Sequence, residues 1–119
     1  MKVYDQAHAL AKALKDSDEY KNFIEAKDKL EEDEKAKEMF LDFRKYEFEF
    51  QKEKFEGKKP DEEKIERLKN MYEVVNMNLV IKHYLAAEYR FGKMMGDISK
   101  ILGDAVNLNE LQEITGTKE

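Results

Sequence analysis

The stretch PDEEKIERLKNMYEVVNMNLVIKHYLAAEYRFGKMMGDISKIL, Pro60 to Leu102, decides the fold of this chain. Apolar residues recur in it at helical spacing, and in its second half they occupy nearly every side, so we expect one continuous, buried helix. At a rise of about 1.5 Å per residue this helix would be roughly 60 Å long, whereas a compact domain of this length has a radius of gyration of about 13–14 Å. Because the rest of the chain cannot cover such a rod, the sequence predicts that another chain covers part of it.

The apolar side of this helix changes along its length. One side is formed early by Ile65, Leu68, Tyr72, Val75 and Leu79. A second side, about 140° around the helix, is formed later by Met77, Val80, Ile81, Tyr84, Phe91, Met95, Ile98 and Leu102. We therefore expect the helix to change its packing partner near its middle, first contacting the preceding helix and then the N-terminal helices, a second protomer or both.

The preceding segment, residues 34–56, is expected to be a long helix with two apolar stripes. The wider stripe contains Ala36, Met39, Phe40, Phe43, Tyr46 and Phe50, and should pack within the protomer. The narrower stripe, Leu41, Phe48 and Phe55, repeats every seven residues and is typical of a surface that meets a second helix or a second chain. Gly57 and Pro60 suit the end of one helix and the start of the next, so a short turn should make the two long helices antiparallel neighbours.

The remaining segments are expected to be short. Helices are predicted at 4–15 and 18–31. The run Asp16–Glu19 should supply the capping side chains of the second helix, with Asp16 and Glu19 at capping-box spacing if Asp16 is the cap, and Asp33 should cap the helix that follows. Gly103 should end the long helix, residues 107–114 should form a last short helix, and residues 115–119 should be a frayed tail. No linker or repeat interrupts this order, so residues 1–119 are expected to be one all-α domain.

Composition argues against several classes of function. The chain is 41% hydrophobic and 41% charged, with a net charge of -5, which opposes binding to phosphate backbones and makes nucleic acid a poor partner. It has no cysteine, so it offers no disulfide and no thiolate metal site. The N-terminus resembles no secretory signal, and no apolar run approaches the length of a membrane span. We expect a soluble, cytoplasmic protein with no membrane partner.

Several segments together resemble the YlbF/YmcA family of small helical bacterial proteins, particularly its YheA-like branch. They are Tyr4–Leu10 (YDQAHAL), Ser17–Tyr20 (SDEY), Asp33–Arg44 (DEKAKEMFLDFR), Tyr84–Phe91 (YLAAEYRF) and Asp97–Leu102 (DISKIL). The resemblance implies two long helices preceded by shorter ones, association into dimers or higher oligomers, and, from some relatives, a subunit role in regulatory complexes. Relatives that share an iron–sulfur cluster hold it through cysteines that are absent here, so the resemblance implies no cofactor for this chain.

Glu88 is the most interesting ionisable residue, because it falls on the apolar side of the long helix. A buried carboxylate must be paired or protonated, and we expect it to accept hydrogen bonds from a Tyr or Arg of a neighbouring helix; a functional site there is the alternative. His8 and His83 lack the spacing of a metal site, and Ser17 and Ser99 have no histidine nearby in sequence. We expect no metal, no catalytic residue and no enzyme activity, with a hidden enzyme or metal site around Glu88 as a rival hypothesis.

Two further features allow a functional and a structural interpretation. Lys54, Lys58 and Lys59 gather with aromatics near the turn between the long helices, which could dock a partner or, as the main alternative function, bind RNA. Interspersed glutamates favour a solvated surface instead. Gly92 and Gly96 have the spacing that lets another helix approach closely, although a helix can also tolerate two such positions.

The sequence therefore predicts an antiparallel hairpin of two long helices with short N-terminal helices, assembled as a helical-bundle homo-oligomer. The expected function is non-enzymatic: a homodimer or higher oligomer acting as an interaction or regulatory protein, with another protein as its partner. The predicted interface residues are Leu41, Phe48, Phe55, Phe91, Gly92, Met95 and Gly96.

Overall fold

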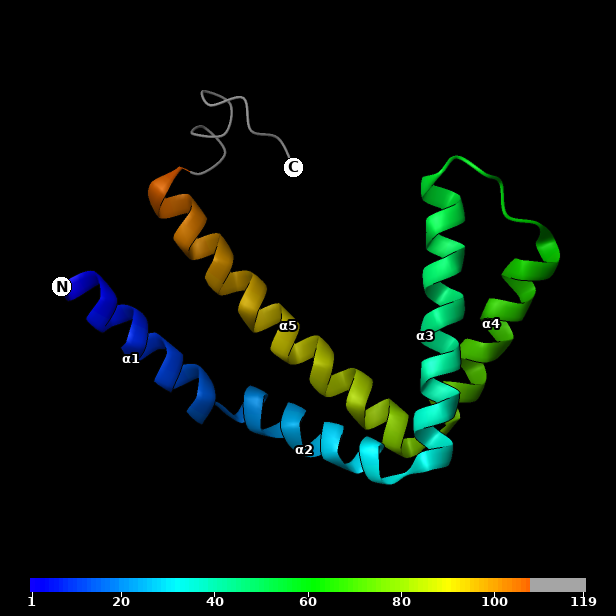
Figure 1. Cartoon of the computed structure of the whole chain (residues 1–119), viewed down its shortest axis with the longest axis horizontal. Coiled ribbons are helices and arrows are strands. Elements are labelled where there is room, and N and C mark those ends of the chain that lie inside the picture. Colours follow the sequence, from blue (N-terminus) through cyan, green and yellow to red (C-terminus); the bar gives the residue numbers. More distant parts are fainter. Residues whose placement is uncertain (108–119) are drawn as a thin grey trace.

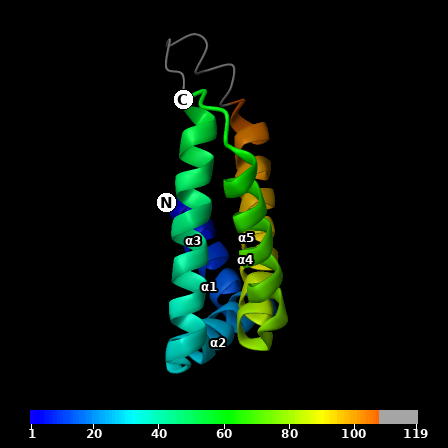
Figure 2. The ribbon, with the colours of Figure 1, turned by 90° about the vertical axis from the view of Figure 1, so that its right-hand side faces the viewer.

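Five helices make up the part of the chain that the computed structural model describes, residues 1–107. They are α1 (Lys2–Asp16), α2 (Asp18–Glu32), α3 (Glu34–Phe55), α4 (Glu62–Met77) and α5 (Leu79–Val106). Figure 1 shows a V in which α1, α2 and α5 form one arm and the antiparallel pair α3 and α4 forms the other. The all-α prediction is confirmed, and the two long helices predicted around Gly57 and Pro60 do form a hairpin, α3–α4 (Figure 2).

Polar side chains cap the helices as their sequence positions suggest. Asp33 accepts a hydrogen bond from the backbone N–H of Ala36 at 3.0 Å, so its predicted role as a cap is confirmed. The cap of α2 is Ser17, which accepts from the N–H of Tyr20 at 3.1 Å, and not Asp16, which is still inside α1. The extended backbone of Ser17 lets α1 leave the direction of α2.

The predicted continuous helix over residues 60–102 was wrong: α4 and α5 are separate helices. Asn78 has an extended backbone (φ -85°, ψ 115°), and its side chain accepts a hydrogen bond from the N–H of Ile81 at 3.1 Å. The short amide side chain of Asn78 can cap a new helix, and this capping competes with the continuation of α4. The expected change of packing partner occurs at this break, because α4 packs on α3 whereas α5 packs mainly on α2.

The end of α5 also differs from expectation. Gly103 is not its cap: the helix continues to Val106 and ends at Asn107, whose left-handed backbone (φ 50°) is one that asparagine tolerates better than most residues. Residue 107 is therefore a helix cap, and the rest of the predicted helix 107–114, like the predicted tail 115–119, lies outside the described residues.

The core lies at the vertex of the V, where four helices meet. Its buried residues are Leu30 of α2, Ala36, Phe40 and Phe43 of α3, Val75 of α4 and Ile81 of α5. The wider stripe of α3 was predicted to pack within the protomer, and its buried members do so. Away from the vertex the molecule is thin: its extents are 53 × 37 × 16 Å and its radius of gyration is 18.9 Å, against about 13–14 Å for a compact domain of this length.

Replacing the cap of α5 tests the break. Asn78→Ala should lower the free energy of unfolding by about 1 kcal/mol, because the first turn of α5 loses a hydrogen-bond acceptor. Chemical denaturation followed by circular dichroism measures this. Asn70→Ala, which removes the same side chain from the exposed surface of α4, should leave stability within about 0.5 kcal/mol of the original. Equal losses in the two variants would contradict a capping role for Asn78.

Candidate interaction surfaces

An ion pair joins the two arms next to the core. Arg44 of α3 donates a hydrogen bond to the carboxylate of Glu88 of α5, and its guanidinium lies over the ring of Phe40, 4.8 Å from the centroid. Glu88 thus has the arginine partner from a neighbouring helix that the sequence suggested. It is not a buried carboxylate, however, because both side chains of the pair are more than a third exposed. The pair fixes how α3 crosses α5.

Tyr84 lies between this ion pair and the core. Its ring meets the ring of Phe40 edge-on, with centroids 5.2 Å apart, and also contacts Phe23. Burial raises the pKa of the Tyr84 hydroxyl, and the negative charge of Glu88 raises it further. A neutral tyrosine beside a paired carboxylate can orient helices. Within residues 1–107 no three acidic or histidine side chains gather as a metal site, and Glu88 stands beside a tyrosine and an arginine, not beside a second carboxylate.

The narrow stripe of α3 is uncovered in the single chain. Leu41 is exposed, the Phe48 side chain is 69% exposed, and Phe55 is 93% exposed. Phe48 lies one helical turn beyond Arg44, so the stripe continues the side of α3 that meets α5 at the vertex. The arms diverge away from the vertex (Figure 1), so α5 does not cover this side of α3 further along the helix. We call this stripe, Leu41, Phe48 and Phe55, the α3 stripe.

The facing part of α5 carries small residues. Gly92 and Gly96 follow Glu88 at intervals of four residues and therefore share its side of the helix. A Cβ atom built on either glycine would meet nothing within 4 Å, so no segment of the described chain makes the close approach that their spacing suggested. Met95 is also exposed. The α3 stripe and these α5 positions continue, along the two arms, the helix sides that meet at the Arg44–Glu88 pair, and we call these two sides the inner sides of the V.

Phe91, one of the predicted interface residues, already has aromatic neighbours within the protomer. Its ring stacks on Phe23 of α2, with centroids 5.2 Å apart and planes 4° from parallel, and it also contacts Tyr20. The sequence placed Phe91 on an apolar side of the long helix but could not decide which neighbour it meets. That neighbour is α2 of the same chain, so Phe91 belongs to the packing of the protomer.

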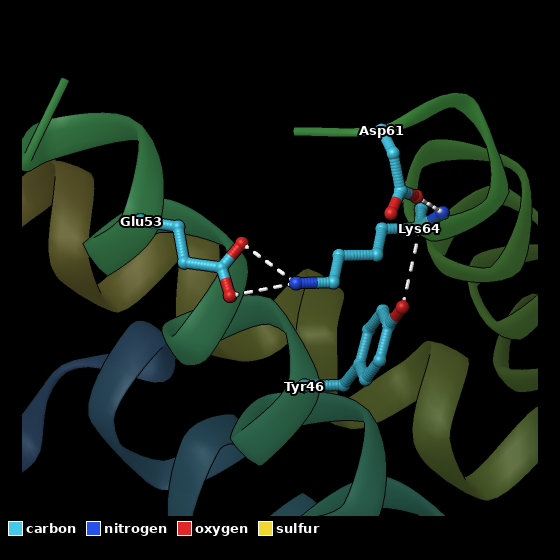
Figure 3. Close-up of polar contacts among 4 residues, drawn as sticks. All are labelled: Tyr46, Glu53, Asp61 and Lys64. Carbon is cyan, nitrogen blue, oxygen red and sulfur yellow. Dashed lines mark hydrogen bonds and ion pairs between the residues drawn. The ribbon is translucent and has the colours of Figure 1, made fainter. Parts of the chain in front are cut away.

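The turn between α3 and α4 carries the predicted docking lysines, and all three of them, Lys54, Lys58 and Lys59, are exposed. Nearby, Lys64 donates to both carboxylate oxygens of Glu53, at 2.8 and 3.1 Å, which raises the pKa of the lysine (Figure 3). The hydroxyl of Tyr46 donates to the backbone carbonyl of Lys64 at 3.4 Å. Because an acidic residue neutralises Lys64, the turn is a mixed-charge surface and not a continuous basic patch.

The sequence did not anticipate a shallow groove between α3 and α4. Its volume is about 460 Å³, with Met39, Met71 and Val74 among its apolar walls and Asp42 and Arg67 on its rim. The guanidinium of Arg67 lies 5.2 Å from the ring centroid of Tyr46, which holds it at the side of the groove. The only sequence signal for this groove was the alternation of Met71 and Val74 with polar residues, which places both residues off the main apolar side of α4.

None of the described helices combines the length and the apolarity that crossing a membrane requires.

The order of these helices and the exposed stripe can now be compared with known proteins. A family model described as control of competence regulator ComK, YlbF/YmcA, matches residues 3–107. The chain belongs to the YlbF/YmcA family. Members similar to it include proteins named UPF0342. The one from Symbiobacterium thermophilum is 42% identical over 107 residues, which cover 90% of this chain and 96% of the relative. The one from Halothermothrix orenii is 41% identical over 117 residues, which cover 97% of this chain and 99% of the relative. Another, from Caldicellulosiruptor saccharolyticus, is 40% identical over 108 residues, 91% and 90%.

One solved structure supports the fold of this YlbF/YmcA member. It is a protein of unknown function (DUF964) from Bacillus stearothermophilus, with a TM-score of 0.75 over 90% of this chain and 94% of that one. At 17% identity the likeness concerns the fold alone. The family resemblance drawn from the sequence motifs is thus confirmed.

A double-mutant cycle tests the contact between the arms. Arg44→Ala and Glu88→Ala should show a coupling free energy of about 0.5–1 kcal/mol, because a pair that is more than a third exposed is screened by water. Urea denaturation of the two single variants and the double variant gives this value. Strictly additive losses would mean that the ion pair does not help to hold α3 against α5.

Alkaline titration tests the setting of Tyr84. Because the pKa of Tyr84 is raised in the folded chain, the folded state binds the hydroxyl proton more tightly than the unfolded state does. The resulting stabilisation of the folded state is complete below the unfolded pKa of about 10. It is lost as the pH rises from there through the folded pKa. The unfolding free energy of the unmodified chain should therefore fall more steeply above about pH 10 than that of Tyr84→Phe. Parallel slopes in the two proteins would contradict the raised pKa.

Proposed function

We propose that this protein is a non-enzymatic regulatory interaction protein that works in the cytoplasm as a homo-oligomer, with another protein as its further partner. The single observation that carries the proposal is the α3 stripe, whose two phenylalanines are mostly exposed although each would gain about 2–3 kcal/mol from full burial. Large exposed apolar surfaces on soluble helical chains are typical of association sites.

The inner sides of the V form the proposed self-association surface. The α3 stripe supplies bulky aromatic side chains, whereas Gly92 and Gly96 of α5 leave room at the backbone, so a partner helix could pack closely between them. Aromatic residues are also the side chains most often responsible for binding energy at interfaces. Continuity with the Arg44–Glu88 contact would extend an existing helix–helix packing outward along both arms.

A regulatory role is supported by family membership, because the matching family is described by control of a competence regulator. A packing role for the polar cluster of Arg44, Glu88 and Tyr84 is supported by the pairing of its charges, since Arg44 donates to Glu88 between α3 and α5. RNA binding by the turn lysines is the weaker alternative, since Glu53 already pairs with Lys64 there and the net charge is -5.

Analytical ultracentrifugation across a wide concentration range tests the proposal. The unmodified chain should sediment as a dimer or larger, and Phe48→Ser combined with Phe55→Ser should shift dissociation to at least tenfold higher concentration, because each loses apolar contact area. The matched control is Met77→Ser, which changes an apolar residue of α4 that is 81% exposed and belongs neither to the α3 stripe nor to the groove between α3 and α4.

Self-association would be refuted if the unmodified chain remained a monomer at every concentration. If the double variant instead unfolds more easily without any change in mass, the α3 stripe is part of the protomer's own packing and the proposed surface is wrong.

A further inference from the structure

The groove between α3 and α4 brings the core of the vertex to the surface of the hairpin. Its apolar walls are formed by Met39, Met71, Val74 and Val75. Val75 is buried in the core, Met39 and Met71 are partly buried against it, and Val74 is 50% exposed. Figure 2 shows α3 and α4 side by side along this part of the hairpin. The groove is therefore an apolar surface that continues the core and that water reaches.

The groove is elongated. On α4 the residues that line it, from Glu63 to Val74, recur at intervals of three and four and so follow one line along the helix. At a rise of about 1.5 Å per residue this line is about 16 Å long, or three helical turns. Pockets for small ligands enclose about 70–90% of the ligand surface, whereas the rim of this groove is exposed and Val74 is half exposed. The shape therefore fits an elongated occupant better than a compact one.

Acidic side chains dominate the rim of the groove. Asp42, Glu63 and Glu66 are exposed there, and within residues 1–107 none of them belongs to an ion pair. Arg67 is the basic residue among the lining side chains, and its guanidinium lies beside the ring of Tyr46. Three carboxylates against one guanidinium give the rim a net negative charge, which complements a cationic partner.

The methionines in the walls favour a helical partner. Methionine side chains are flexible and polarizable, so a groove that they line adapts to the apolar side chains of different partners. An amphipathic helix inserts side chains spaced at i, i+4, i+7 and i+11 into such a groove, and this spacing spans about 16 Å. Basic residues on the two flanks of that helix would then lie beside the acidic rim.

We propose that the groove between α3 and α4 binds an amphipathic helix of a partner protein, with its apolar side against the methionines and with lysine or arginine on its flanks against Asp42, Glu63 and Glu66. The inference deepens the proposed function and rests on it, because it takes another protein to be the partner and adds the chemistry that this partner carries.

The groove is separate from the proposed self-association surface. Met39 lies about 180° around α3 from Phe48, so the groove and the α3 stripe are on opposite sides of that helix. A helix in the groove would therefore leave the α3 stripe accessible, and binding to the groove can be measured independently of self-association.

Fluorescence anisotropy of labelled synthetic peptides with the full chain tests this proposal. The first probe is a peptide of about 18 residues with leucine at i, i+4, i+7 and i+11 and lysine on both flanks, and the second has glutamate in place of each lysine. The lysine peptide should bind with a dissociation constant in the micromolar range. The glutamate peptide should bind at least about tenfold more weakly, because the rim repels it. Added salt should weaken binding of the lysine peptide.

A pair of charge variants separates the rim from the overall charge. Glu63→Gln combined with Glu66→Gln should weaken binding of the lysine peptide about tenfold, and both residues are exposed, so the fold should be retained. The matched control is Asp28→Asn combined with Glu32→Gln, which makes the same change in net charge at exposed positions of α2 outside the groove. Its affinity for the lysine peptide should change less than about twofold.

Val74→Arg tests the apolar walls. The new side chain can extend into solvent from a half-exposed position, so the circular dichroism spectrum should be unchanged. The cation would nevertheless stand where the lysine peptide binds, and binding should fall below detection. Met77→Arg is the matched control: it also changes an exposed apolar residue of α4, but one that does not line the groove, and it should bind the lysine peptide normally.

The results separate this inference from the proposed self-association. If neither peptide binds, or both bind equally well, the groove does not recognise a basic helix. If Val74→Arg lowers the mass of the assembly in sedimentation equilibrium, a second copy covers the groove and the inference is wrong. If the lysine peptide binds as expected to an unmodified chain that sediments as a monomer, self-association fails and the inference stands.

Discussion

The packing of Val75 and Ile81 against the phenylalanines of α3 is the contact on which the whole molecule depends. These two are the largest side chains with essentially no exposure, and they lie three residues on either side of Asn78, where α4 ends and α5 begins. Phe40 and Phe43 cover them from α3. Both arms of the V therefore start from one small core, and a helix break that would otherwise be a flexible joint is held by the best-packed residues in the chain.

A core at one vertex has a consequence for the rest of the surface. The molecule is 16 Å through its shortest dimension, about the thickness of two helices packed side by side with axes about 8–10 Å apart (Figure 2). Helices arranged in so thin a molecule cannot hide all of their apolar sides from water, which is why the α3 stripe is exposed along its whole length and Ile101 is exposed on the outer part of α5. Exposure here follows from the architecture and not from a local irregularity.

The same architecture links stability to association. If the inner sides of the V are completed by another copy, part of each protomer's apolar packing exists only in the assembly, and the free energy of folding then depends on protein concentration. The polar contacts have a different role. The contacts of Arg44, Glu88 and Tyr84 define how the arms cross at the vertex. They therefore set the direction in which the exposed stripes face, although they contribute little to the free energy of folding.

Helical periodicity, capping residues and the Gly57 to Pro60 turn were sufficient to predict an all-α chain, the α3–α4 hairpin and the buried stripe of α3, because these depend on local signals and on which side of a helix a residue occupies. The family followed from motifs in order. The break at Asn78 was not predictable from periodicity, since asparagine is tolerated inside helices and becomes a cap only where two packing partners pull the segments apart. For the same reason Phe91 could be assigned to an apolar side but not to a partner. Which helix covers which stripe is decided by the angles between helices, and those angles exist only once the vertex has packed.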